Sequence, residues 1–171
     1  MWDFGRAELL EPEAIGEPGH RTFRLRILSG GEAASLWLEK EQLAALTLGI
    51  RQLLEQTASE EPSVESDPPQ PADAFPEQPE VDFHVGRLGI GYDETKRLLV
   101  IAAHAPDETE DAPPTFTCQV SRRQCRDLVE RAEEVISAGR PLCLLCSLPL
   151  EGDSHQCLRR NGQEKHPVSL E

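Results

Sequence analysis

Four side chains of the kind that bind zinc lie close together near the end of the sequence. They form a Cys-x2-Cys pair and a His-x-Cys pair, at Cys143, Cys146, His155 and Cys157. Three thiolates and one imidazole satisfy a tetrahedral zinc ion and leave no position for water or substrate. The spacing therefore predicts a structural Zn²⁺ site of the Cys3His type rather than a catalytic one.

The segment around these ligands is too short to build a hydrophobic core of its own. Metal binding would therefore supply most of its folding free energy. We expect a body at residues 1–139 and a small zinc-ribbon-like tail at residues 140–171. Two alternatives stay open: ordinary buried thiols beside a surface His155, or redox use of the Cys143–Cys146 pair. The redox use would need a thioredoxin-like βαβ setting, which the pattern lacks.

Two other kinds of site compete with a purely structural tail. Arg159 and Arg160 directly follow the last ligand, and zinc ribbons often contact nucleic acid. An enzyme site could lie near residues 16–21 and the hairpin around Tyr92, although no nucleophile stands at a recognisable spacing from any histidine. We expect neither, and interpret the protein as a non-enzymatic binding or adaptor protein with a protein partner.

The net charge of −14 is concentrated in two stretches. Residues 57–80 hold seven acids and six prolines, and residues 106–114 hold four acids; neither stretch contains Lys or Arg. Without them the chain has 20 acids and 17 bases, so the rest is almost neutral. Residues 57–80 are too polar to offset the entropy of ordering, which predicts a disordered insertion. The acidity also disfavours nucleic-acid binding.

Apolar periodicity predicts five strands and two helices in the body. A Ser121-x2-Gln124 capping box opens the second helix. Gly86 interrupts the alternation of its strand, which indicates a bulge or a bend. The predicted strands lie at 22–28, 34–38, 81–92, 97–103 and 115–120, and the helices at 40–56 and 121–137.

The segments that lead into the two predicted helices are similar in sequence. Leu36–Leu43 aligns with Cys118–Cys125 at an offset of 82, and the apolar register continues along both helices. Duplication explains this, with chance similarity between amphipathic helices as the alternative. Neither helix can bury its apolar stripe alone. We expect an α+β fold in which two strand–strand–helix repeats form a mainly antiparallel sheet with both helices on one face.

The remaining features indicate a cytoplasmic protein. Five cysteines, three of them beside a histidine, do not resemble a disulfide framework. Cys118 and Cys125 fall on apolar faces and are expected in the core. The first residues show no signal peptide, and no apolar run reaches the length of a membrane helix.

Three blocks resemble a known family. They are Gly16–Phe23, Leu38–Gln42 and the ending from Arg140-Pro141 through the four ligands to Asn161-Gly162. Their order and spacing resemble the actinobacterial and Chloroflexi family called "domain of unknown function 3090". Leu144 and Ser147 stand where family members often have Pro and Gly. The family has no established activity. Its members are often encoded near a phosphatidylinositol-kinase-like protein, which the resemblance implies as a possible partner.

Overall fold

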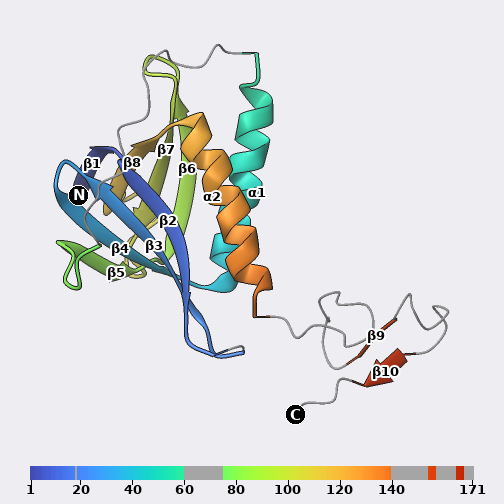
Figure 1. The fold of residues 1–171 in the computed structure, drawn as a ribbon. Coiled ribbons are helices and arrows are strands. Elements are labelled where there is room, and N and C mark those ends of the chain that lie inside the picture. The colour runs from blue at the N-terminus through green and yellow to red at the C-terminus, as the bar shows by residue number, and fades with distance from the viewer. Residues whose placement is uncertain (18, 60–74, 140–153, 157–164, 168–171) are drawn as a thin grey trace.

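The structure, a computed structural model, describes residues 1–17, 19–59, 75–139, 154–156 and 165–167 (Figure 1). The elements of this part of the chain are β1 (Trp2–Arg6), β2 (Leu9–Ile15), β3 (Thr22–Ser29), β4 (Glu32–Leu38), α1 (Lys40–Gln56), β5 (Val81–His84), β6 (Arg87–Asp93), β7 (Leu98–His104), β8 (Phe116–Val120), α2 (Arg122–Ser137), β9 (Ser154–Gln156) and β10 (Lys165–Pro167). The α+β class that the sequence predicts is confirmed.

Two four-stranded sheets form the body. The N-sheet has the strand order β2-β3-β4-β5, and the C-sheet has the order β1-β8-β7-β6. In each sheet two neighbouring pairs are antiparallel, and one pair is parallel: β4 with β5, and β1 with β8. The strands are thus divided between two sheets, where the sequence led us to expect one.

The chain passes directly from one sheet into the other at two places. Val85 N–H donates to Trp37 O in the N-sheet at 2.9 Å, and the next amide, Gly86 N–H, donates to His104 O in the C-sheet at 2.8 Å. The connection from β1 to β2 changes sheets in the same way. The pairings therefore close into a ring, in which β1–β2 and β5–β6 each serve both sheets.

The fold repeats itself along the chain. The first half, β1-β2-β3-β4-α1, corresponds to the second half, β5-β6-β7-β8-α2. Leu36 pairs with Leu25 in the first half, and Cys118, 82 residues after Leu36, pairs with Ile101 in the second. Each half gives its first strand to the other half's sheet, because β1 pairs with β8 and β5 with β4.

Matching glutamines begin the two helices. Gln42 Oε1 accepts from Glu39 N–H, and Gln124 Oε1 accepts from Ser121 N–H, both at 2.9 Å. The other end of each side chain ties its helix to a sheet crossing: Gln42 Nε2 donates to Val85 O at 2.9 Å, and Gln124 Nε2 donates to Ala7 O at 2.8 Å. The repeat thus extends to individual hydrogen bonds, and the predicted capping box at Ser121 is confirmed.

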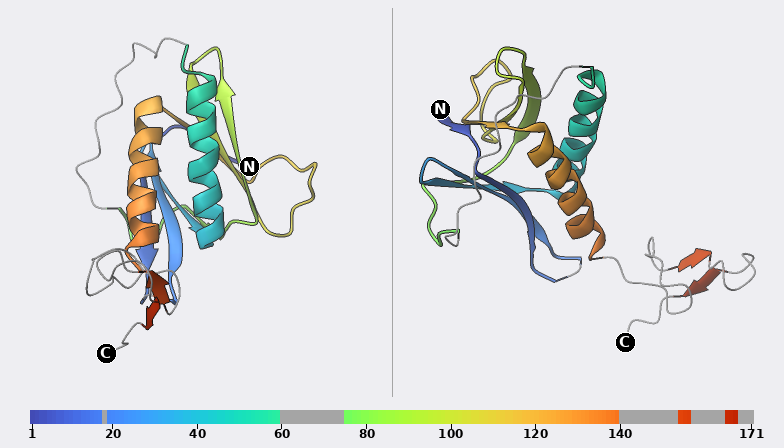
Figure 2. Two further views of the ribbon diagram at one scale, coloured as in Figure 1. Left: turned by 90° about the vertical axis from the view of Figure 1, so that its right-hand side faces the viewer. Right: turned by 45° about the horizontal axis from the view of Figure 1, so that its top comes forward.

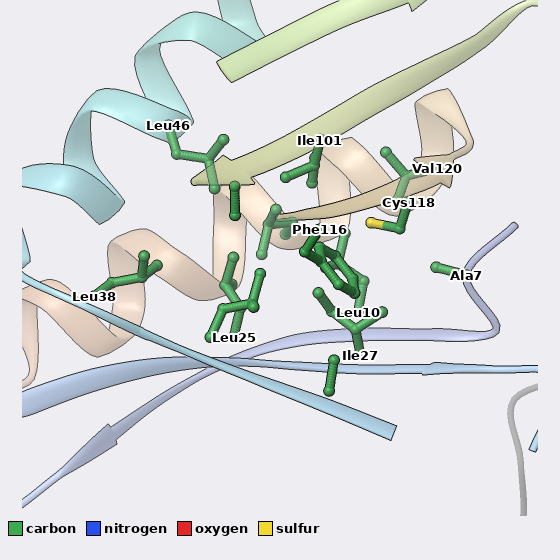
Figure 3. Packing of buried hydrophobic residues seen from close by; sticks show 14 of the residues in the cluster. Ala7, Leu10, Leu25, Ile27, Leu38, Leu46, Ile101, Phe116, Cys118 and Val120 are labelled. Carbon is green, nitrogen blue, oxygen red and sulfur yellow. The ribbon is translucent and has the colours of Figure 1, made fainter. Parts of the chain in front are cut away.

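The core lies between the facing sheets. Leu25 and Ile27 of the N-sheet point toward Ile101, Phe116 and Cys118 of the C-sheet, and all five are fully buried (Figure 3). Burial of such side chains is worth about 1.5–3 kcal/mol each.

The two helices run antiparallel, side by side, over one side of the sheets (Figure 2). Arg122 at the start of α2 donates to Leu54 O near the end of α1 at 2.9 Å. Each helix also packs on an edge strand, α1 on β6 and α2 on β2. Neither helix is long and apolar enough to cross a membrane, and the described residues contain no other helix.

The ends of the acidic stretch at 57–80 make specific contacts. Thr57 Oγ1 donates to Leu53 O at 2.8 Å. The ring of Phe75 packs against two arginines of β3, and Glu80 accepts from Ala33 N–H at 2.6 Å. The predicted disorder therefore does not apply to these ends, while residues 60–74 lie outside the described residues.

Candidate functional site

The predicted zinc ligands fall mostly outside the described residues. His155 lies on β9, and the antiparallel register sets His166 of β10 opposite it. Cys143, Cys146 and Cys157 lie outside the described residues, as do Arg159 and Arg160. His166 is not one of the predicted ligands. Elsewhere in the described part of the chain, His, Cys, Asp and Glu form no group of three that could hold a metal ion.

A polar cavity of about 320 Å³ lies where the turn between β2 and β3 meets the start of α1 and the end of α2. Gly19 and Arg21 line it together with Lys40 at the start of α1 and Gly139 after α2. The Arg21 guanidinium is already engaged, because Nη1 donates to Val135 O at 2.8 Å. This is the region of the predicted enzyme site at residues 16–21.

Tyr92, the other part of that enzyme hypothesis, lies elsewhere. It is the penultimate residue of β6, before the turn to β7, and this turn is the second half's equivalent of the turn that contains residues 16–21. The two turns lie at opposite ends of the body (Figure 1). The structure therefore does not bring together the two regions of the hypothesis.

A polar cluster at the end of β7 was not predicted from the sequence. His104 Nδ1 lies 3.3 Å from Glu108 Oε2 and 3.2 Å from Arg87 Nη2. Thr115 donates its hydroxyl to Glu108, and this bond, with Ala105 N–H and nearby His104, holds the pKa of the Glu108 carboxyl below its usual value. The groups satisfy one another and fix the 105–115 loop. No sequence motif marks the cluster, because a turn and two strands assemble it.

The buried cysteines are not reactive groups. Cys118 and Cys125 are both fully buried, as the sequence predicts. Burial raises the pKa of the Cys118 thiol well above its usual value and that of Cys125 to about 12. Both are therefore protonated near neutral pH, and only thiolates act as nucleophiles or metal ligands.

The outer face of the N-sheet is covered by charged and aromatic side chains. Arg24 Nε donates to Glu13 at 2.9 Å, and Arg26 Nη2 donates to Glu11 at 2.8 Å. Phe75 lies over both guanidinium groups, with its ring centre 5.6 and 5.7 Å from their carbons.

The equivalent outer face of the C-sheet carries small residues. Gly91 pairs with Val100 where Glu13 pairs with Arg24, and Gly89 pairs with Ala102 where Glu11 pairs with Arg26. Val100 and Ala102 are half-buried. None of the contacts described across this face corresponds to that of Phe75. Two faces built on one backbone pattern thus differ in their surface chemistry.

A smaller cavity of about 200 Å³ lies between α1 and β6. Ala45 and Leu46 of the helix and Leu88, Gly89 and Ile90 of the strand contribute to its wall. Its lining is mainly apolar, in contrast to the cavity beside Arg21.

The chain belongs to a family described as "Protein of unknown function (DUF3090)", whose sequence profile matches residues 2–157. This confirms the family resemblance of the three sequence blocks. No curated protein and no solved structure matches the chain.

Proposed function

We propose that this protein is a cytoplasmic binding or adaptor protein whose tail is held by a structural zinc ion. The observation that carries the binding role is the outer face of the C-sheet. Val100, Ala102 and two glycines of β6 place small residues there, beside Gln119 and Thr117 of β8, while the chain covers the equivalent N-sheet face with its own ion pairs and Phe75. A partner protein covers this outer face of the C-sheet.

The family itself supports one partner to test first. Family members are often encoded near a phosphatidylinositol-kinase-like protein, so this protein is the natural first bait. The tagged full chain should retain its partner in stoichiometric amounts through purification from its own cells. Val100→Glu with Ala102→Glu should abolish this, because desolvating a carboxylate at an interface is costly. Ala44→Glu on the exposed surface of α1 is the matched control. Retention of the partner by the double variant would reject the C-sheet face.

The zinc ion would be held by Cys143, Cys146, His155 and Cys157. Support comes from the donor set, three thiols and an imidazole at knuckle spacing, and from the β9–β10 ribbon that carries His155. Zinc would act there as a cross-link that folds the tail. Elemental analysis of the purified chain should give one zinc per chain, and Cys146→Ser should lose it. A metal-free protein whose Cys143 and Cys146 react freely with alkylating reagents would contradict the proposal.

A further inference from the structure

Two equivalent grooves occur in the body, each between a helix and an edge strand. The first lies between α2 and β2, and the second between α1 and β6. Because of the repeat, each position in one groove has a counterpart in the other, so the two grooves can be compared residue by residue. The counterparts follow from strand register and from the helix offset of 82.

An ion pair between a helix residue and a strand residue closes the first groove. Arg131 of α2 donates to Glu11 of β2 at 2.6 Å, and the long arginine side chain spans the groove. Pro12 follows on the edge strand and offers no N–H there. Asp127 and Glu130, both exposed, place further charge on the helix side of this groove.

The second groove lacks both members of that ion pair. Gly49 stands at the counterpart of Arg131, and Gly89 at the counterpart of Glu11. Gly89 lines the 200 Å³ cavity, whereas Gly49 packs against Ile90, whose Cγ2 would lie 3.3 Å from a Cβ at position 49. The helix side of the cavity is formed by Gln42, Ala45 and Leu46, and Ala45 replaces Asp127 there. Leu48, on the neighbouring surface of α1, replaces Glu130. Leu48 is 58% exposed, which makes it one of the few large hydrophobic side chains that the described residues expose.

We propose that this α1–β6 groove receives one aliphatic or aromatic side chain of a partner protein. In the first groove, the long side chain of Arg131 lies between the helix and the strand. We expect the occupant of the second groove to be one side chain of similar length. The lining shows its chemistry, because the counterpart of Glu11 is a glycine and the wall is mainly apolar, with Ala45, Leu46 and Ile90. Gln42 and Arg87 are the polar residues of the lining. Anchors of this kind, seated in a small pocket, carry much of the binding energy in protein interfaces.

This inference rests on the proposed binding role and adds its anchor point. Gly89 belongs both to the outer face of the C-sheet and to the wall of the groove. A partner that lies on the C-sheet face can therefore reach over β6 and place a side chain against α1. The two surfaces are continuous through this one strand.

The test is a titration of the purified full chain, followed by methyl NMR at Leu46, Leu88 and Ile90. The probes are N-acetyl-leucinamide and N-acetyl-phenylalaninamide, with N-acetyl-argininamide as the charged comparison. We expect saturable shifts with the first two probes only. Ala45→Asp with Leu48→Glu, which copies the first groove onto exposed positions, should weaken this binding about tenfold or more. Ala44→Asp adds the same charge outside the groove and should leave binding unchanged.

Each other outcome overturns the inference. It fails if no probe gives saturable shifts, if argininamide binds equally well, or if the α2–β2 groove responds in the same way. It also fails if sedimentation velocity shows a dimer that the double variant abolishes, because the occupant is then a second copy. If a partner co-purifies equally with the wild type and the Ala45→Asp, Leu48→Glu variant, the groove is rejected while the binding role stands. If no partner co-purifies, the binding role is rejected, and with it the partner side chain proposed here, even where the probes bind.

Discussion

Arg51 of α1 donates a hydrogen bond to Glu133 of α2, and the two residues occupy equivalent positions of the repeat, 82 residues apart. In a twofold arrangement a residue can meet its own counterpart only at the axis. The pseudo-twofold axis of the body therefore passes between the helices beside this pair. The helix pair is thus the centre of the duplicated fold.

The Arg51–Glu133 pair should contribute little to stability despite its central place. Both side chains are about half exposed, at 53% and 50%, and exposed ion pairs contribute about 0–1 kcal/mol. Glu133→Ala should lower the free energy of unfolding by less than about 1 kcal/mol in urea denaturation. Exchanging the two residues, Arg51→Glu with Glu133→Arg, should restore most of that loss. A loss several times larger would show that the pair, and not apolar packing, holds the helices together.

The two capping glutamines should be of equal importance. Gln42 and Gln124 each cap their own helix and each bind a backbone carbonyl where the chain changes sheets. Replacing either by Ala should cost about 1–2 kcal/mol, since each change removes a cap and leaves a carbonyl without its donor. Gln52→Ala on the exposed side of α1 is the control and should cost almost nothing. Clearly unequal losses at the two positions would contradict the equivalence of the halves.

The sequence predicts the second half better than the first. The helix at 40–56 and the helix that opens at Ser121 follow from apolar spacing and capping residues alone. β1 and β2 were not predicted: Gly5 interrupts one, and Pro12 stands in the other, where a proline normally argues against a strand. Pro12 is tolerated because β2 is an edge strand, which only the tertiary pairing reveals.

The division into two sheets and the polar clusters also escape sequence analysis, for a related reason. Val85 and Gly86 look like one interrupted strand, yet their amides bond to different sheets. The offset of 82 identifies the repeat, but not the exchange of β1 and β5 between its halves. Features within one helix can be predicted from residue spacing, whereas the cluster around His104 and the groove between α1 and β6 depend on segments that are distant in sequence.

Gly86 should tolerate no side chain. A Cβ placed on it would lie 2.5 Å from the Cα of Pro106, a backbone atom that cannot move aside independently. Gly86→Ala should therefore lower the free energy of unfolding by about 1–3 kcal/mol, the usual cost of overpacking. Gly91→Ala, on β6, which begins directly after Gly86, has open space around its Cβ and should be close to neutral. Equal stability of the two variants would show that the close approach to Pro106 is not maintained.

The buried thiols should make the protein less stable in alkali. Burial raises the pKa of Cys125 from 9.0 to about 12. Below pH 9 the thiol is protonated in both states; above it, the unfolded chain loses the proton more readily, so stability falls as the pH rises from 9 toward 12. Urea denaturation across this range should show a shallower decline for Cys125→Ala than for the wild type. Parallel declines would contradict a buried, protonated thiol.

Glu108 should make the 105–115 loop sensitive to acid. The Thr115 hydroxyl, Ala105 N–H and nearby His104 lower the carboxyl pKa from 4.5, so the ionised form favours the folded loop. That contribution is complete above pH 4.5 and is lost as the pH falls through the lowered value of the folded state. In an NMR titration, the amide of Ala105, which donates to Glu108 Oε2 at 3.2 Å, should shift with a midpoint below 4.5. Thr115→Val should move this midpoint upward, because it removes the largest cause of the lowered pKa. Asp107→Asn, at the exposed neighbouring position, should leave it in place. A midpoint for Ala105 that does not respond to Thr115→Val would contradict the cluster as the structure shows it.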